Sequence, residues 1–315
     1  QVGFNRSLLV ELANNNIIIL RKLFSNGNEE TQLRILSQIE STMQIASKIK
    51  DKNSDHRGAI MRNVSASLLS CIKTTKSIAT AVAEKARNVC RMTLAYSGTD
   101  TLLQRASAEL LAQSTRLTGD KGVTSVCKAL VQELTTAIDP GVRSALALGL
   151  GCLHRCVGGM ALSPFVSSTV DALVKIASEP IGGAHRWALY SLSLVADSAG
   201  LSFMQHVRTS LDLSVALLMK ESLYQQNLIL SVASVVNSTI GVLGPELVPK
   251  SKTFIRQAGL ISENEFVDSD AASGSSMHIS GAMEKQRILY IQQLLLFAPQ
   301  AVPIAELIYR VALAL

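Results

Sequence analysis

Three residues in the middle of the chain have the types and close spacing of a metal site. They are Cys152, His154 and Cys156, within VRSALALGLGCLHRCVGG (142–159), and thiolate and imidazole are preferred ligands of zinc. On a helix, however, the two cysteines lie about 40° apart, whereas His154 points roughly 160–200° away from both. Three ligands arranged in this way cannot converge on one tetrahedral ion. The motif therefore favours buried structural cysteines on an apolar helix face.

Other reactive motifs are also missing from the sequence. The glycines between 149 and 159 fit neither a dinucleotide fingerprint nor a phosphate-binding loop, and they are better explained as close-packing points and a helix stop. No H-E-x-x-H or G-x-S-x-G pattern occurs. We therefore expect no catalytic, cofactor-binding or metal-binding residues, no cofactor, and no enzymatic activity. The five histidines are His56, His154, His185, His206 and His278.

The composition indicates helices that are covered on two sides. Of the 315 residues, 48% are hydrophobic but only 4% aromatic, and 17% are charged, which is below the share of about 25% in average soluble domains. The five cysteines are odd in number and lack C-x-x-C spacing, which favours buried thiols in a reducing compartment. The chain begins with Gln1 and ends in mid-pattern, so we expect a piece of a longer protein.

The net charge of +6 lies entirely in the first third of the chain. Residues 1–100 hold 14 Lys and Arg against 8 Asp and Glu, whereas residues 101–315 hold 16 of each. A basic surface could meet nucleic acid, anionic lipid or an acidic protein segment. A solvated helix surface is the simpler interpretation, because Lys and Arg are rarely buried.

Gly and Pro punctuate the chain at nearly fixed intervals. Measured at the glycine, the breaks at 119, 159, 200 and 244 are 40, 41 and 44 residues apart, and the last interval, to FAP (297–299), lengthens to about 54 where a polar insert occupies 262–280. A period of roughly 40–47 residues with two helices per unit is typical of HEAT and armadillo repeats. We therefore predict an all-α fold, an α-solenoid of roughly seven helix pairs, with no sheet.

Four segments follow from this pattern. Residues 1–100 are predicted to form less regular, basic helical repeats, and 101–261 regular HEAT repeats. Residues 262–280 read as a flexible polar loop, and 281–315 as further HEAT helices that continue beyond the fragment. The helices predicted by period are Ser7–Phe24, Glu30–Lys48, Arg57–Thr74, Ser77–Tyr96, Gly122–Ile138, Val142–Val157, Ser167–Glu179, His185–Ser198, Phe203–Met219 and Tyr224–Leu243.

Individual residues leave alternatives open. Asp139 is either the N-cap of the helix that follows Pro140, or the partner of Arg143 in a ladder of charges between repeats; the ladder is slightly favoured. Trp187, the only Trp, is expected in the core, although an exposed Trp in a groove can be a binding hot spot. The run Leu228–Leu243 comes closest to a membrane span, but it is shorter than the roughly 20 residues needed and contains several polar side chains.

The residues of the repeats resemble one family of large solenoids. IDPGVRSALALGLGCLHRCVGG (138–159), HRWALYSLSLVADSAG (185–200), VLGPELV (242–248) and ILYIQQLLLFAPQAV (288–302) are similar to the HEAT repeat-containing protein 5 family. The similarity covers about residues 80–315. The insert at 262–280 departs from the family's pattern, as does Cys156, where an aromatic residue is more usual.

The resemblance implies a non-enzymatic scaffold in vesicle-mediated transport. Members of that family are cytoplasmic proteins that support clathrin adaptor complex 1 and its accessory proteins, peripherally at the trans-Golgi network and endosomes. It implies protein partners, indirect membrane contact, and neither a small-molecule substrate nor nucleic acid. The alternative is a transport receptor for nuclear import or another protein-binding solenoid. An import receptor is expected to have rows of Trp and Asn along its inner helices, and the single Trp of this chain counts against it.

Overall fold

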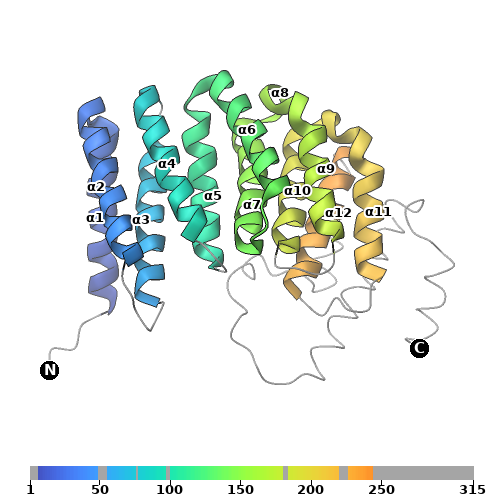
Figure 1. Ribbon diagram of the computed structural model, residues 1–315, viewed down its shortest axis with the longest axis horizontal. Coiled ribbons are helices and arrows are strands. Elements are labelled where there is room, and N and C mark those ends of the chain that lie inside the picture. The colour runs from blue at the N-terminus through green and yellow to red at the C-terminus, as the bar shows by residue number, and fades with distance from the viewer. Residues whose placement is uncertain are drawn as a thin grey trace. The chain divides into compact units, whose positions relative to one another are not determined.

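Helices make up all the regular structure of the described residues. The computed structural model describes residues 6–48, 55–75, 77–96, 100–179, 184–219 and 226–243, and no strand occurs in these ranges (Figure 1). The chain divides into two compact units, Gln1–Phe165 and Val166–Leu315. The first contains α1 (Arg6–Asn26), α2 (Glu29–Lys48), α3 (Asp55–Thr74), α4 (Thr80–Tyr96), α5 (Thr101–Arg116), α6 (Gly119–Thr136), α7 (Pro140–Val157), α8 (Gly159–Leu162) and the 3-10 turn η1 (Ser163–Phe165).

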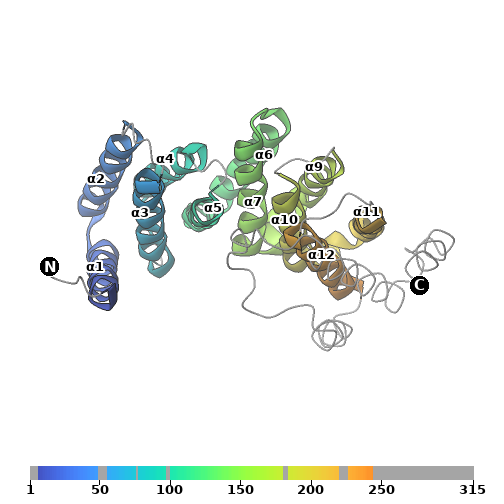
Figure 2. The ribbon, with the colours of Figure 1, turned by 90° about the horizontal axis from the view of Figure 1, so that it is seen from below.

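The first unit is a two-layered stack of helices. One layer consists of α1, α3, α5 and α7, in which each helix contacts the next, and α2, α4 and α6 lie on the other side (Figure 2). Contacts between the layers, such as those of α4 with α5 and of α6 with α7, join consecutive helices into pairs. This arrangement is the predicted α-solenoid.

The second unit repeats the scheme with α9 (Val166–Ser178), α10 (His185–Ala199), the 3-10 helix η2 (Gly200–His206), α11 (Val207–Met219) and α12 (Gln226–Leu243). Here α10 packs against α12, and α9 and α11 each contact the helix that follows them. Trp187 of α10 is 4% exposed and lies edge-on to Tyr190, with 6.0 Å between ring centroids. The prediction that Trp187 belongs to the core is confirmed.

The helix α7 is surrounded on every side. All residues from Ser144 to His154 are buried, which includes both the apolar face and the side of small and polar residues. The side-chain oxygen of Asp139 accepts a hydrogen bond from the Val142 amide at 2.8 Å, so Asp139 is the N-cap, followed by Pro140 in the first turn. The helix ends at Gly158, whose φ of 89° is a conformation that side chains rarely adopt.

Most of the predicted helices are confirmed to within a few residues, with three corrections. Residues 203–206 belong to the 3-10 helix η2 and not to the α-helix predicted over Phe203–Met219. Within the repeats predicted over 101–261, no bounds were predicted for the helix at 101–116, which is α5, nor for any helix at 159–165, where α8 and η1 lie. Positive φ angles at Gly119, Gly158 and Gly200 coincide with the first three predicted breaks, one residue early at the second.

The described residues contain five helix pairs in addition to α1: α2–α3, α4–α5, α6–α7, α9–α10 and α11–α12. The loop predicted at 262–280 and the helices predicted at 281–315 lie outside the described residues, as do the breaks at 244 and 297–299. The number of roughly seven pairs and the four-segment division therefore stay predictions.

One apolar stretch, Met160–Ser178, is long and hydrophobic enough to cross a membrane by length and composition, whereas Leu228–Leu243 is shorter. The sequence had pointed to the second of these as the closer candidate. In the fold, the longer stretch is interrupted by η1, which contains Pro164, and its apolar residues Leu162, Val166, Val170 and Leu173 are buried. Packing between helices thus accounts for the buried part of this stretch, which is 44% of it.

Asp100 joins two helices of the first unit through one carboxylate. One oxygen accepts from the Leu103 amide at 3.0 Å as the N-cap of α5, and the other lies 2.6 Å from Arg62 of α3. Asp100→Ala should lower the free energy of unfolding by about 1–2 kcal/mol, because both contacts are lost. Asp100→Asn keeps the cap and should cost less than about 1 kcal/mol. Urea titrations measure both, and equal losses in the two variants would show that the cap is unimportant.

Gly149, in the interior of α7, and Gly158, its C-cap, should respond oppositely to substitution by alanine. Gly158→Ala forces a side chain into the φ of 89° and should cost about 1–3 kcal/mol. Gly149→Ala places its Cβ 3.5 Å from Leu111 Cδ2, an ordinary contact, and should gain about 0.5–1 kcal/mol in a helix interior. Thermal unfolding of both variants checks this. Destabilisation by Gly149→Ala would mean that α5 and α7 pack too closely for a methyl group.

Candidate functional site

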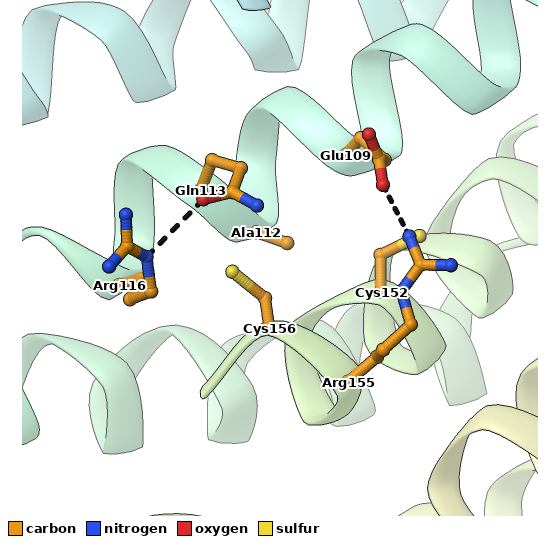
Figure 3. A pocket seen from close by; sticks show the side chains of 7 residues that line it. All are labelled: Glu109, Ala112, Gln113, Arg116, Cys152, Arg155 and Cys156. Carbon is orange, nitrogen blue, oxygen red and sulfur yellow. Dashed lines mark hydrogen bonds and ion pairs between the residues drawn. The ribbon is translucent and has the colours of Figure 1, made fainter. Parts of the chain in front are cut away.

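A pocket of about 400 Å³ opens between α5 and α7 in the first unit (Figure 3). The two helices are neighbours in the same layer, and α6, which lies between them in the chain, contacts both. The pocket is lined by Glu109, Ala112, Gln113 and Arg116 of α5 and by Cys152, Arg155 and Cys156 of α7.

Helical spacing places these side chains in one recess. On α5, residues 109, 113 and 116 follow each other at four and three positions, which puts them on one face of the helix. On α7, residues 152, 155 and 156 are likewise three and four positions apart. Small side chains, those of Ala112, Cys152 and Cys156, stand where the helices face each other, while the long polar side chains extend from the two helices around them. The recess therefore combines an apolar surface with a charged surround.

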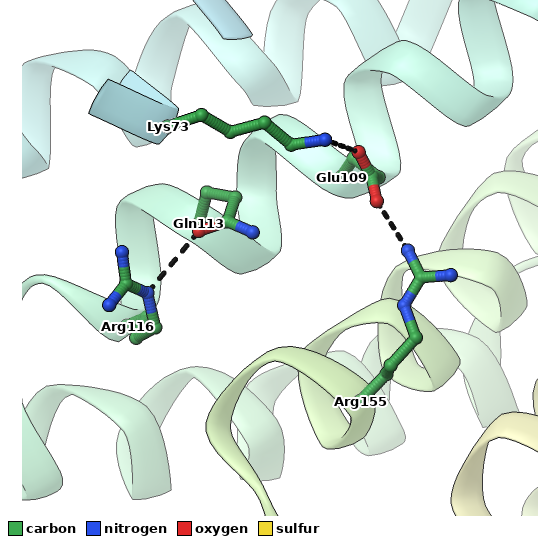
Figure 4. A network of polar contacts seen from close by, with 5 residues as sticks. All are labelled: Lys73, Glu109, Gln113, Arg116 and Arg155. Atoms are coloured by element: carbon green, nitrogen blue, oxygen red, sulfur yellow. Dashed lines mark hydrogen bonds and ion pairs between the residues drawn. The ribbon is translucent and has the colours of Figure 1, made fainter. Parts of the chain in front are cut away.

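Glu109 is the centre of a charge network that connects three helices. One carboxylate oxygen lies 2.6 Å from Lys73 Nζ of α3, and the other pairs with Arg155 of α7 (Figure 4). Arg116 donates through Nε to the side-chain oxygen of Gln113 at 3.3 Å. Because these side chains are a quarter to nearly half exposed, the ion pairs contribute little to stability, on the order of 0–1 kcal/mol each. Their larger effect is to fix where the charges stand.

The two pocket cysteines are weak nucleophiles. Burial raises the pKa of Cys152 to about 12, and the nearby Arg155 opposes this shift only in part. The pKa of Cys156, which is half-buried, is also raised by burial, with the neighbouring Arg116 working against the shift. Both thiols are therefore protonated and uncharged at neutral pH. The pocket suits binding of a polar group better than covalent chemistry.

His154 does not join the cysteines that flank it in sequence. It is 1% exposed, it does not line the pocket, and burial lowers its pKa to about 4. The predicted divergence of His154 from Cys152 and Cys156 on the helix agrees with this placement. Among the described residues, no three His, Cys, Asp or Glu side chains are grouped so that they could hold a metal ion.

The pocket residues were not identified from the sequence. No catalytic, cofactor or metal residue was predicted, and the cysteines were assigned to packing alone. The missed signal was the polar series Glu109, Gln113 and Arg116 at helical spacing, which becomes visible once α5 is placed. Lys73 lies in the predicted basic front, but its partner Glu109 is 36 positions further along the chain, so their pairing could not be read from spacing.

A ladder of charges between consecutive repeats exists in the first unit. Two further pairs, Arg91–Glu133 at 2.5 Å and Lys85–Glu40 at 2.6 Å, join α4 to α6 and α4 to α2. Asp139 is the N-cap of α7, as one alternative held, and the ladder role of the Asp139–Arg143 pair stays a prediction.

The fold and the pocket define the class: an α-solenoid with a recess between two of its helices. No family model matches the chain. The chain is 30% identical over 298 residues to Protein SWEETIE of Arabidopsis thaliana, and the match covers 93% of this chain but only 13% of that protein. A match of this extent runs through both units and includes the region of the pocket. The resemblance to the HEAT repeat-containing protein 5 family stays a prediction.

The buried His154 predicts a specific dependence of stability on pH. Because its folded pKa of about 4 lies below the unfolded value of 6.5, the unfolded state binds more protons, and stability is lost as the pH falls from about 6.5 to 4. We expect wild type to lose about 3 kcal/mol relative to His154→Gln over this range, in urea titrations at several pH values. Taking the difference cancels the other histidines. A difference that does not vary with pH would contradict the burial of a neutral His154.

Proposed function

We propose that this chain is a non-enzymatic segment of a protein-binding scaffold. The observation that carries the proposal is the layered stack of helix pairs, which repeats the same arrangement of helices along the chain and exposes rows of side chains at its surface. A surface of this kind suits extended peptide segments or folded domains, because many weak contacts along it can add up. The match covers 13% of Protein SWEETIE, so the chain spans only a small part of that relative's length.

Three carboxylates of the described residues have structural partners, which supports a binding role over catalysis. Asp100 and Asp139 cap helices, and Glu109 bridges two cations. The pKa of the buried thiols of Cys71 and Cys90 is raised to about 11 and about 12, so these groups are not activated nucleophiles.

The finer proposal is a role in vesicle-mediated transport. We propose that the chain supports clathrin adaptor complex 1 together with its accessory proteins, in the cytoplasm and peripherally at trans-Golgi network and endosomal membranes. Its support is the resemblance of ALGLGCLHRCVGG (147–159) and WALYSLSLVADSAG (187–200) to the HEAT repeat-containing protein 5 family. These two stretches form most of α7 and α10, two corresponding helices of the repeat.

A vesicle sedimentation experiment tests this role. Purified chain is mixed with vesicles of trans-Golgi-like composition, with and without purified clathrin adaptor complex 1. We expect the chain to sediment only when the adaptor is present, because the proposed membrane contact is indirect. Equal sedimentation without adaptor would make the chain a membrane-binding protein in its own right, and no sedimentation in either case would overturn the adaptor role.

A capture experiment from cytosol separates the scaffold from its alternatives. Enrichment of adaptor subunits on the immobilised chain supports the proposal. Enrichment of import cargo, or of RNA with a steep loss of binding as salt rises, would overturn it in favour of a transport receptor or a nucleic-acid-binding protein.

A further inference from the structure

Cations outnumber carboxylates around the pocket between α5 and α7. Lys73, Arg116 and Arg155 stand against Glu109 alone, and Glu109 is already shared between Lys73 and Arg155. Arg116 differs from the other two, because within the described part of the chain it donates to neutral groups, the side-chain oxygen of Gln113 and the Cys156 thiol. A guanidinium on the pocket wall thus faces the recess without a carboxylate.

The interior of the pocket suits a short side chain with one negative charge. Ala112, Cys152 and Cys156 supply weakly polar surface for methylene groups, and the Gln113 amide and Arg116 supply hydrogen-bond donors beside it. The planar fork of an arginine matches the two oxygens of a carboxylate. A doubly charged phosphate would meet stronger repulsion from Glu109, which lines the same recess.

We propose that this pocket binds an Asp or Glu side chain from an extended acidic segment of a partner protein, with Arg116 as the principal anchor. The inference rests on the proposed scaffold function and names the chemistry of one partner segment. A peptide is favoured over a membrane surface because the recess is sunk between two helices, where a single side chain reaches but a flat bilayer meets the helix ridges first.

The first test measures binding of an acetylated and amidated hexaglutamate peptide to the 315-residue chain by calorimetry, with hexaglutamine as the neutral control. Arg116→Gln should weaken binding by about tenfold or more, since it removes a charge-assisted hydrogen bond. Arg208→Gln is the matched control: it removes the same charge from a side chain that is 84% exposed and does not line the pocket. It should change binding by less than about twofold.

A second variant keeps the test decisive if Arg116→Gln affects folding. Glu109→Gln removes the carboxylate that opposes an anion and releases Lys73 and Arg155, so it should strengthen hexaglutamate binding severalfold. The half-buried Cys156 gives an independent readout, because bound peptide should slow its alkylation, as measured by mass spectrometry at that residue. Weaker binding by Glu109→Gln, or equal losses in Arg116→Gln and Arg208→Gln, would overturn the site.

Other anions separate the possible sources of the charge. Binding of phosphatidylserine vesicles that depends on Arg116, without binding of hexaglutamate, would replace the peptide by a lipid surface. Competition by inorganic phosphate that exceeds competition by acetate would overturn the preference for a carboxylate. If hexaglutamate fails while adaptor complex 1 still recruits the chain to vesicles, only the pocket inference falls. If hexaglutamate binds through Arg116 while the adaptor does not bind the chain, only the adaptor role falls.

Discussion

Burial on both sides of a helix is the constraint on which this structure depends. A helix at the surface of a globular protein buries one apolar face, whereas α7 has no exposed residue from 144 to 154. Such a helix must have small or aliphatic side chains around its whole circumference, which explains the low share of charged and aromatic residues in the chain. The buried hydroxyls and thiols of this layer follow from the same need, because Ser, Ala and Cys let adjacent helices approach closely.

The same constraint decides where charge can stand. Several charged side chains stand at the surface and pair with a residue on the next helix of the same layer. Glu109 with Arg155, Arg91 with Glu133 and Lys85 with Glu40 all join helices two apart in the chain order. Each pair is worth little energy by itself. Their regular position is nevertheless informative, because they connect consecutive repeats and show which ridge of each layer meets water.

Features of the fold that depend on neighbouring residues in the sequence could be predicted, whereas features that depend on contacts between distant segments could not. Helix periodicity and Gly breaks are local, so nearly all helices, the N-cap Asp139 and the buried Trp187 could be predicted. The 3-10 helix over 200–206 could not, because its apolar residues fit an α-helical period and the difference lies only in hydrogen bonding. The pocket depends on the packing of α5 against α7, about 40 residues apart, and this register is not encoded in either segment alone. Cys152 and Cys156 were therefore assigned to the apolar face, which they share, without the recess beside it.

The recess arises where the packing constraint is met by small side chains on both helices. Ala112 stands opposite Cys152 and Cys156, so less volume fills the space between α5 and α7 at this level than a pair of leucines would fill. A gap of this kind near the core would be a cavity that costs stability, but at a ridge it opens to solvent and is surrounded by the charges that the layer excludes from its interior. Arg116 stands at the last turn of α5, where a cation is favoured by the helix dipole whether or not it binds a ligand. The helix end therefore favours a cation at this position, and the exposed side chain of Arg116 is accessible to an acidic partner at the recess.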